Sequence, residues 1–124
     1  KGITVDRNFA EQIPTINADL DQLKRVFTNL FDNAIAAMEG DGTLRVSTSY
    51  DHDLQTTRIE VADTGSGIKP EDKDRLFLPY FSRKRGGTGL GLAIVHQIVA
   101  DHSGYVRVSD NHPRGTVMTI ELPC

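Results

Sequence analysis

A regular spacing of apolar residues between Asp19 and Met38 most constrains what this chain can fold into. Apolar side chains recur there at three- and four-residue steps, which places them on one face of an α-helix. They are Leu20, Leu23, Phe27, Leu30, Phe31, Ala34, Ile35 and Met38. At 1.5 Å per residue, such a helix is about 30 Å long. Asp19 suits its N-cap, and Gly40 and Gly42 are expected to end it.

Shorter patterns before and after this helix predict strands and two more helices. Alternating apolar and polar residues, or short apolar runs between turn residues, are typical of strands. They occur at residues 3–9, 43–50, 57–62, 105–109 and 116–122. A short helix is expected from Pro70 to about Phe77, and a second long helix from Thr88 to about His102. The sum predicts an α/β fold: a two-layer sandwich with about three helices on one face of a mixed sheet of about five strands.

Length and composition limit the class of protein. The 124 residues fit one domain, residues 1–124, and because the chain starts with Lys1 we expect a piece of a longer protein. The net charge of −3 does not favour general binding to nucleic acid. Cys124 is the only cysteine, which excludes an internal disulfide and agrees with a reducing cytoplasm. No apolar run is long enough to span a membrane, so we expect no membrane contact.

Two asparagines lie on the polar side of the first long helix. Asn29 and Asn33 are four residues apart, so they share a face roughly opposite Leu20, Leu30 and Ile35. Taken alone, they could be solvated amides or they could be ligands.

A carboxylate followed by glycines comes directly after the predicted strand 57–62. Asp63 precedes Gly65 and Gly67, and glycine lets a planar ring approach the backbone closely. Asp63 could accept a hydrogen bond from an exocyclic amine such as that of adenine. The alternative is a plain turn with a capping aspartate.

A second glycine-rich segment opens the second long helix. Gly87, Gly89 and Gly91 would present free backbone N–H groups at the positive end of that helix, which is a cradle for phosphate. An aromatic cluster at residues 77–81 and a basic patch at residues 83–85 come just before it, and cations there could reach phosphate oxygens.

In this order and spacing, the four blocks resemble the nucleotide-binding boxes of the histidine kinase catalytic domain. That domain shares its ATPase superfamily, and the Bergerat fold, with gyrase, the ninety-kilodalton heat-shock chaperone and MutL. Residues 29–34 look like the N box, 63–68 the first glycine box, 77–81 the F box and 87–92 the second glycine box, while Gly115-Thr116 resembles the final box. The sequences of residues 33–38 and 81–84 are similar to those of nitrogen-regulation sensor kinases.

The resemblance implies a site for ATP and Mg²⁺. Asn33 would bind Mg²⁺ through its amide oxygen, Asn29 and Lys84 would position phosphates, and no other residue of the chain would be catalytic. The implied nucleotide-binding residues are Asn29, Asn33, Ala37, Asp63, Gly65, Gly67, Ile68, Phe81, Ser82, Arg83, Lys84, Gly87, Thr88, Gly89, Leu90, Gly91, Leu92 and Thr116. The segment 82–87 would be a lid over the nucleotide.

The resemblance also implies partners. The γ-phosphate would go to a histidine on the kinase's own phosphoacceptor domain, which is dimeric in the full kinase, and from there to a response regulator. The domain would be cytoplasmic, within a full-length protein that a membrane anchor could hold. This sequence departs from the family pattern at Ala36, where many relatives have a basic residue. His52, His96, His102 and His112 do not stand in the family's acceptor context, and the two on the second long helix are expected to be packing or surface residues.

Four other functions fit parts of the pattern. ATP hydrolases of the superfamily, and the related anti-sigma-factor serine kinases, usually have an acidic residue where this chain has Asn29. Asp63-Thr64-Gly65 matches the triplet of retroviral-type aspartic proteases, which are nearly all β. A nucleotide-binding module without catalysis is also compatible with the sequence.

Overall fold

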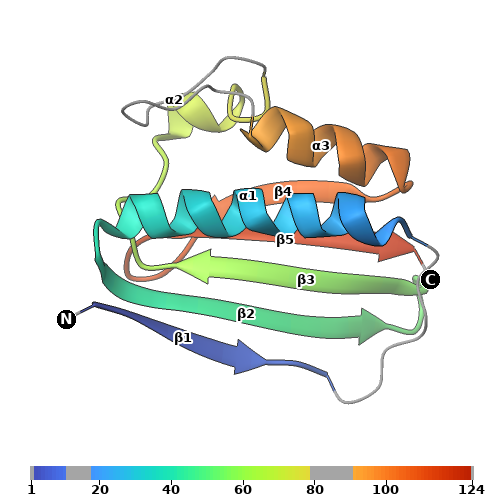
Figure 1. The fold of residues 1–124 in the computed structure, drawn as a ribbon, viewed down its shortest axis with the longest axis horizontal. Helices are drawn as coiled ribbons and strands as arrows, with labels where there is room; N and C mark the ends of the chain where they lie inside the picture. Colours follow the sequence, from blue (N-terminus) through green and yellow to red (C-terminus); the bar gives the residue numbers. More distant parts are fainter. Residues whose placement is uncertain (1, 11–17, 79–90, 124) are drawn as a thin grey trace.

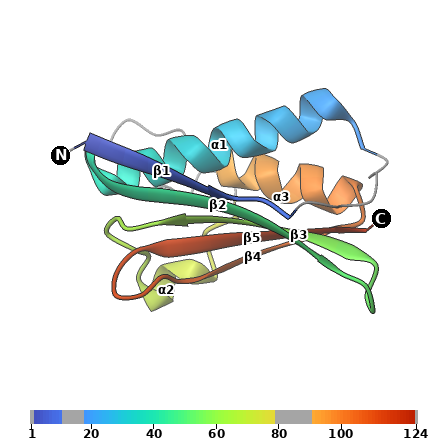
Figure 2. The same cartoon turned by 90° about the horizontal axis from the view of Figure 1, so that it is seen from below.

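The computed structural model describes residues 2–10, 18–78 and 91–123, which form two layers (Figure 1). The strands are β1 (Gly2–Asn8), β2 (Asp41–Asp51), β3 (Thr56–Asp63), β4 (Tyr105–Asp110) and β5 (Thr116–Pro123). They form one sheet in the order β1-β2-β3-β5-β4, in which β1 runs parallel to β2 and the other neighbours are antiparallel. The helices are α1 (Leu20–Met38), α2 (Pro70–Lys73) and α3 (Gly91–Asp101). Figure 2 shows α1 and α3 on one face of the sheet, which confirms the predicted sandwich.

Both ends of α1 are capped by local hydrogen bonds. The Asp19 side chain accepts from the Gln22 N–H at 3.2 Å, as expected of an N-cap. At the other end, Glu39 adopts a left-handed φ of 52° and its N–H donates to the Ala36 carbonyl at 3.4 Å. The helix therefore ends at Met38 with Glu39 as its C-cap, and β2 begins after Gly40, at Asp41.

The core lies between the sheet and the two long helices. Its buried members are Val26, Leu30, Ala34, Met38, Leu44, Val61, Val95, Ile98, Val99, Met118, Ile120 and Leu122. On α1 the buried residues follow four-residue steps, because this helix packs against both α3 and the sheet. The prediction that Leu20 and Ile35 belong to the buried face is wrong: they are 66% and 45% exposed, and Val26 is fully buried instead.

α2 is shorter than predicted. The helix covers Pro70–Lys73, and the chain continues in hydrogen-bonded turns, in which the Leu78 N–H donates to the Arg75 carbonyl. Its last residue forms an ion pair with the end of β4, with 2.7 Å between Lys73 Nζ and Asp110 Oδ1. That ion pair ties the segment after β3 to the turn between β4 and β5.

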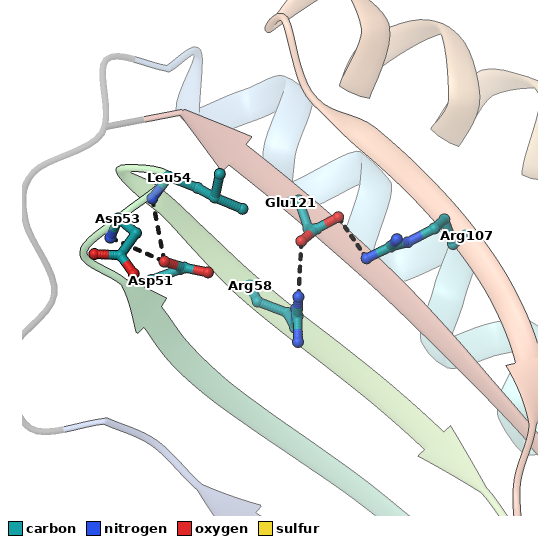
Figure 3. Close-up of polar contacts among 6 residues, drawn as sticks. All are labelled: Asp51, Asp53, Leu54, Arg58, Arg107 and Glu121. Atoms are coloured by element: carbon teal, nitrogen blue, oxygen red, sulfur yellow. Dashed lines mark hydrogen bonds and ion pairs between the residues drawn. The ribbon is translucent and has the colours of Figure 1, made fainter.

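The face of the sheet opposite the helices carries a small ion cluster (Figure 3). Glu121 of β5 accepts from Arg58 of β3 at 3.0 Å and from Arg107 of β4 at 2.6 Å. The Glu121 side chain is 13% exposed, whereas both arginines are more open to solvent. One carboxylate therefore joins three neighbouring strands.

His102 joins the two long helices. Its Nε2 accepts from the Asp19 N–H at 3.0 Å, and its Nδ1 donates to the Ile98 carbonyl at 2.8 Å. One ring nitrogen accepts and the other donates, so this arrangement needs the neutral imidazole. His96 is exposed, with its ring centroid 5.7 Å from that of Phe77. Both histidines thus have the structural roles expected for them.

Candidate functional site

The first glycine segment is fused to the C-terminal end of α1. The Ser66 N–H donates to the Ala37 carbonyl at 3.1 Å. Gly65 is buried against the same carbonyl, so a side-chain carbon at position 65 would lie 2.5 Å from the Ala37 oxygen. Thr64 lies on the other side of this junction, where its Oγ1 accepts from the Thr43 N–H at 3.0 Å. Glycine is therefore required at 65 by contact with α1, in addition to any need of a ligand.

Asp63, the last residue of β3, carries a buried carboxylate. The residue is 6% exposed, and its Oδ1 accepts from the Gly65 N–H at 2.8 Å. Burial raises the pKa of Asp63 above its ordinary value of 3.8, while backbone N–H groups of Gly65 and Thr116 pull the pKa the other way. The Asp63 side chain therefore caps the turn, and its remaining lone pairs can accept a further hydrogen bond, so the acceptor role stays a prediction.

The turn between β4 and β5 closes over the backbone of Asp63. Asn111 Nδ2 donates to the Asp63 carbonyl at 2.7 Å. Gly115 has a φ of 112°, and a side-chain carbon there would collide with the same carbonyl oxygen at 1.9 Å. A side-chain carbon at Gly67 would lie 3.5 Å from the Gly115 oxygen, so Gly67 is next to the same turn. The Gly115-Thr116 turn thus packs directly against Asp63.

Asn29 of α1 faces the start of α3. A side-chain carbon at Gly91 would lie 3.7 Å from Asn29 Oδ1. Asn33, one turn further along α1, is half-buried like Asn29 and Ala37, and all three follow the four-residue step of one helix face. The structure therefore brings Asn29 next to Gly91, Asp63 next to Gly65 and Thr116, and Gly65 next to Ala37.

The remaining predicted residues divide into two groups. Ile68 and Leu92 are partly buried against the core. The rest lie outside the described residues: Phe81, Ser82, Arg83, Lys84, Gly87, Thr88, Gly89 and Leu90. The predicted lid, residues 82–87, belongs to this second group.

Within the described ranges 2–10, 18–78 and 91–123, no three histidine, cysteine, aspartate or glutamate side chains are grouped to hold an ion. Asn33 offers an amide oxygen, a hard donor of the kind that Mg²⁺ accepts. Mg²⁺ commonly binds one or two protein oxygens together with substrate phosphates, so a single asparagine fits a metal that arrives with a nucleotide.

A shallow pocket lies at the other end of the sheet, in the hairpin between β2 and β3. Its lining residues are Ser49, Tyr50, Asp51, His52, Asp53 and Arg58. Asp63 is at the opposite end of β3, so this pocket is separate from the candidate site.

Solved structures of similar shape define the class of protein. The catalytic domain of histidine kinase ThkA has a TM-score of 0.87 and 31% identity, covering 98% of this chain and 78% of that one. Full-length ShkA in complex with AMPPNP has a TM-score of 0.86 and 33% identity, covering 98% of this chain and 26% of that one. The fold is that of a histidine kinase catalytic domain.

The family follows from the sequence match. Residues 18–124 match the model described as histidine kinase-, DNA gyrase B-, and HSP90-like ATPase, and the chain belongs to this family of ATP-binding domains. This membership, with the α/β sandwich, rules out the aspartic protease alternative.

Curated relatives are sensor histidine kinases. The chain is 41% identical to ZraS of Escherichia coli (strain K12) over 113 residues. The matched region covers 91% of this chain and 24% of ZraS. It is 37% identical to NtrB of Rhodobacter capsulatus, a sensory histidine kinase/phosphatase, over 127 residues. That match covers 94% of this chain and 36% of NtrB. These matches agree with the resemblance to nitrogen-regulation sensor kinases. The chain spans about a quarter to a third of these relatives.

Among the described residues, no helix is long and apolar enough to cross a membrane.

Proposed function

We propose that this chain binds Mg-ATP and donates the γ-phosphoryl group to a histidine on a separate phosphoacceptor domain of a two-component sensor kinase. The observation that carries the proposal is the buried Asp63 carboxylate, held by the Gly65 and Thr116 N–H groups at the end of β3. An anion fixed in this way is preorganised to accept from the exocyclic amine of adenine.

The Asn29–Gly91 contact supports the placement of phosphates. Gly91 is the first residue of α3, and the start of a helix has free N–H groups and a partial positive charge. Asn29 lies beside that start, and Asn33 follows one turn along α1. In this proposal Asn33 binds the Mg²⁺ that neutralises phosphate charge, and Lys84 contributes a cation.

The side chain at position 29 favours transfer to a protein acceptor over hydrolysis. Asn29 is an amide and cannot take a proton from water, whereas the hydrolases of the superfamily have an acid in this place. Phosphoryl transfer depends mainly on positioning and charge neutralisation, which this site provides. The acceptor histidine is then supplied by the dimeric phosphoacceptor domain.

The partner domain, the response regulator and a cytoplasmic location complete the proposal. Residues 1–124 would form one domain of a longer kinase. The match to only 24% of the length of ZraS supports this. A related structure, histidine kinase ThkA in complex with the response regulator TrrA, covers 98% of this chain at a TM-score of 0.81. In our proposal the regulator takes its phosphoryl group from the phosphoacceptor histidine and meets this domain only indirectly.

Calorimetry with ADP, with and without Mg²⁺, tests the proposal. The parent should bind Mg-ADP in preference to Mg-GDP, and Asp63→Ala should lose that preference by roughly ten- to a hundred-fold, as expected for a hydrogen bond to a charged group. Asp32→Ala is the matched control, because Asp32 is an exposed aspartate on α1. Failure of the parent to bind Mg-ADP would refute the proposed function.

A further inference from the structure

Asn111 holds the turn between β4 and β5 through its side-chain amide and its backbone N–H. Its Nδ2 donates to the Asp63 carbonyl at 2.7 Å, and its Oδ1 accepts from the His112 N–H at 3.0 Å. Its own backbone N–H donates to the Gly115 carbonyl at 3.0 Å, which closes the turn. Asn111 is half-buried, so these bonds are partly shielded from water.

The same turn also contacts the Asp63 carboxylate. Thr116, directly after Gly115, is 5% exposed and its backbone N–H bonds to that carboxylate. One turn therefore holds both ends of the aspartate: Asn111 bonds to its carbonyl and Thr116 bonds to its side chain. Gly115 leaves no space between the turn and Asp63, because a side-chain carbon there would collide with the Asp63 oxygen.

We infer that Asn111 is a positioning residue that sets the direction of the Asp63 carboxylate and so determines how strongly the site prefers adenine to guanine. The inference rests on the proposed function, in which Asp63 accepts from the adenine amine. Hydrogen bonds weaken steeply when donor and acceptor are misaligned, so a carboxylate free to turn discriminates less between bases. Asn111 acts through Asp63, because its side chain bonds to the Asp63 backbone carbonyl.

Two variants separate this role from a general loss of structure. Asn111→Ala removes the amide, whereas Asn111→Asp keeps an oxygen that can accept from the His112 N–H, replaces the Nδ2 donor with an acceptor and adds a negative charge. Each should lower the ratio of Mg-ADP to Mg-GDP affinity by about three- to ten-fold, the range expected for one hydrogen bond. Arg114→Ala, an exposed residue of the same turn, should leave the ratio unchanged. Thermal unfolding identifies a temperature at which every variant is folded, and the affinities are compared at that temperature.

A double-mutant cycle with Asp63→Ala provides the decisive comparison. If Asn111 acts through Asp63, then adding Asn111→Ala to Asp63→Ala should leave the nucleotide preference unchanged. A purely structural role would instead weaken both nucleotides equally, in both backgrounds, and would overturn the inference. The proposed function fails separately, if the parent shows no adenine preference or if Asp63→Ala keeps it. If Asp63→Ala loses the preference while both Asn111 variants keep it, the inference fails and the proposed function stands.

Discussion

Gly65 and Ala37 are in backbone contact, with 2.5 Å between the Ala37 carbonyl oxygen and the place where a side-chain carbon of residue 65 would be. The Ser66 N–H donates to that same oxygen at 3.1 Å. The end of α1 and the loop after β3 therefore form one unit, in which the helix face of Asn29, Asn33 and Ala37 is fixed relative to Asp63. The adenine and phosphate parts of the proposed site are held together in this way.

Gly65→Ala should destabilise the fold. The new methyl group meets a backbone carbonyl, which has little room to move, and overpacking of this kind costs about 1–3 kcal/mol. Urea unfolding measures the loss. Gly91→Ala is the matched control: its new carbon would lie 3.7 Å from Asn29 Oδ1, an ordinary contact, and alanine is the better helix former. Gly91→Ala should leave stability unchanged or raise it, and equal stability losses in both variants would contradict the contact at Gly65.

Ionisation of Asp63 should cost stability. Burial raises the pKa of Asp63 above 3.8, so the folded state holds the proton more tightly than the unfolded state does. As the pH rises from about 3.8 through the raised pKa, the parent should lose free energy of unfolding relative to Asp63→Asn, and the difference should level off above it. Urea unfolding of both proteins across this pH range measures the difference. A parent that gains stability over Asp63→Asn with rising pH would show the opposite sign.

The affinity for adenosine should rise as Asp63 loses its proton, whereas the free energy of unfolding falls. The ionised carboxylate is the better acceptor for the adenine amine, so affinity should fall as the pH is lowered through the raised pKa of Asp63. Adenosine is used in place of ATP because it carries no titrating phosphate. In Asp63→Asn this pH dependence should disappear, and its persistence there would assign the titration to another group.

Asn33→Ala should weaken metal-dependent binding much more than metal-free adenosine binding. The reason is that Asn33 is proposed to contact the Mg²⁺ and not the base. Calorimetry with Mg-ADP, and with adenosine in a chelator, measures the two affinities, and Thr28→Ala serves as a control at an exposed residue of α1. Equal losses for both ligands would remove Asn33 from the metal site.

Much of the fold follows from periodicity. The strands, α1 and α3 follow local patterns of apolar residues, and each is found close to its predicted bounds. The errors at Leu20 and Ile35 have a physical cause. A helical pattern defines an apolar face, but the side on which α3 packs is decided by tertiary contacts, and these leave both residues exposed.

The candidate site is predictable only in part. Asp63 was a candidate because a carboxylate after a strand, followed by glycines, is a local signal. Asn111 has no such signal: in sequence it is an ordinary turn residue next to a proline and a glycine. Its bond to the Asp63 carbonyl spans 48 positions and exists only once β4 and β5 have paired.

The most direct test of the central claim follows phosphate from ATP to histidine. The chain is incubated with Mg-ATP labelled at the γ-phosphate, alone and with the dimeric histidine-bearing segment of its own kinase. Alone, it should acquire no label and release little free phosphate, because it lacks the acceptor and Asn29 is no base. With the segment, the label should appear on histidine, labile to acid and stable to base. Strong labelling of the lone chain, at one of its four histidines or at a serine, would contradict the account.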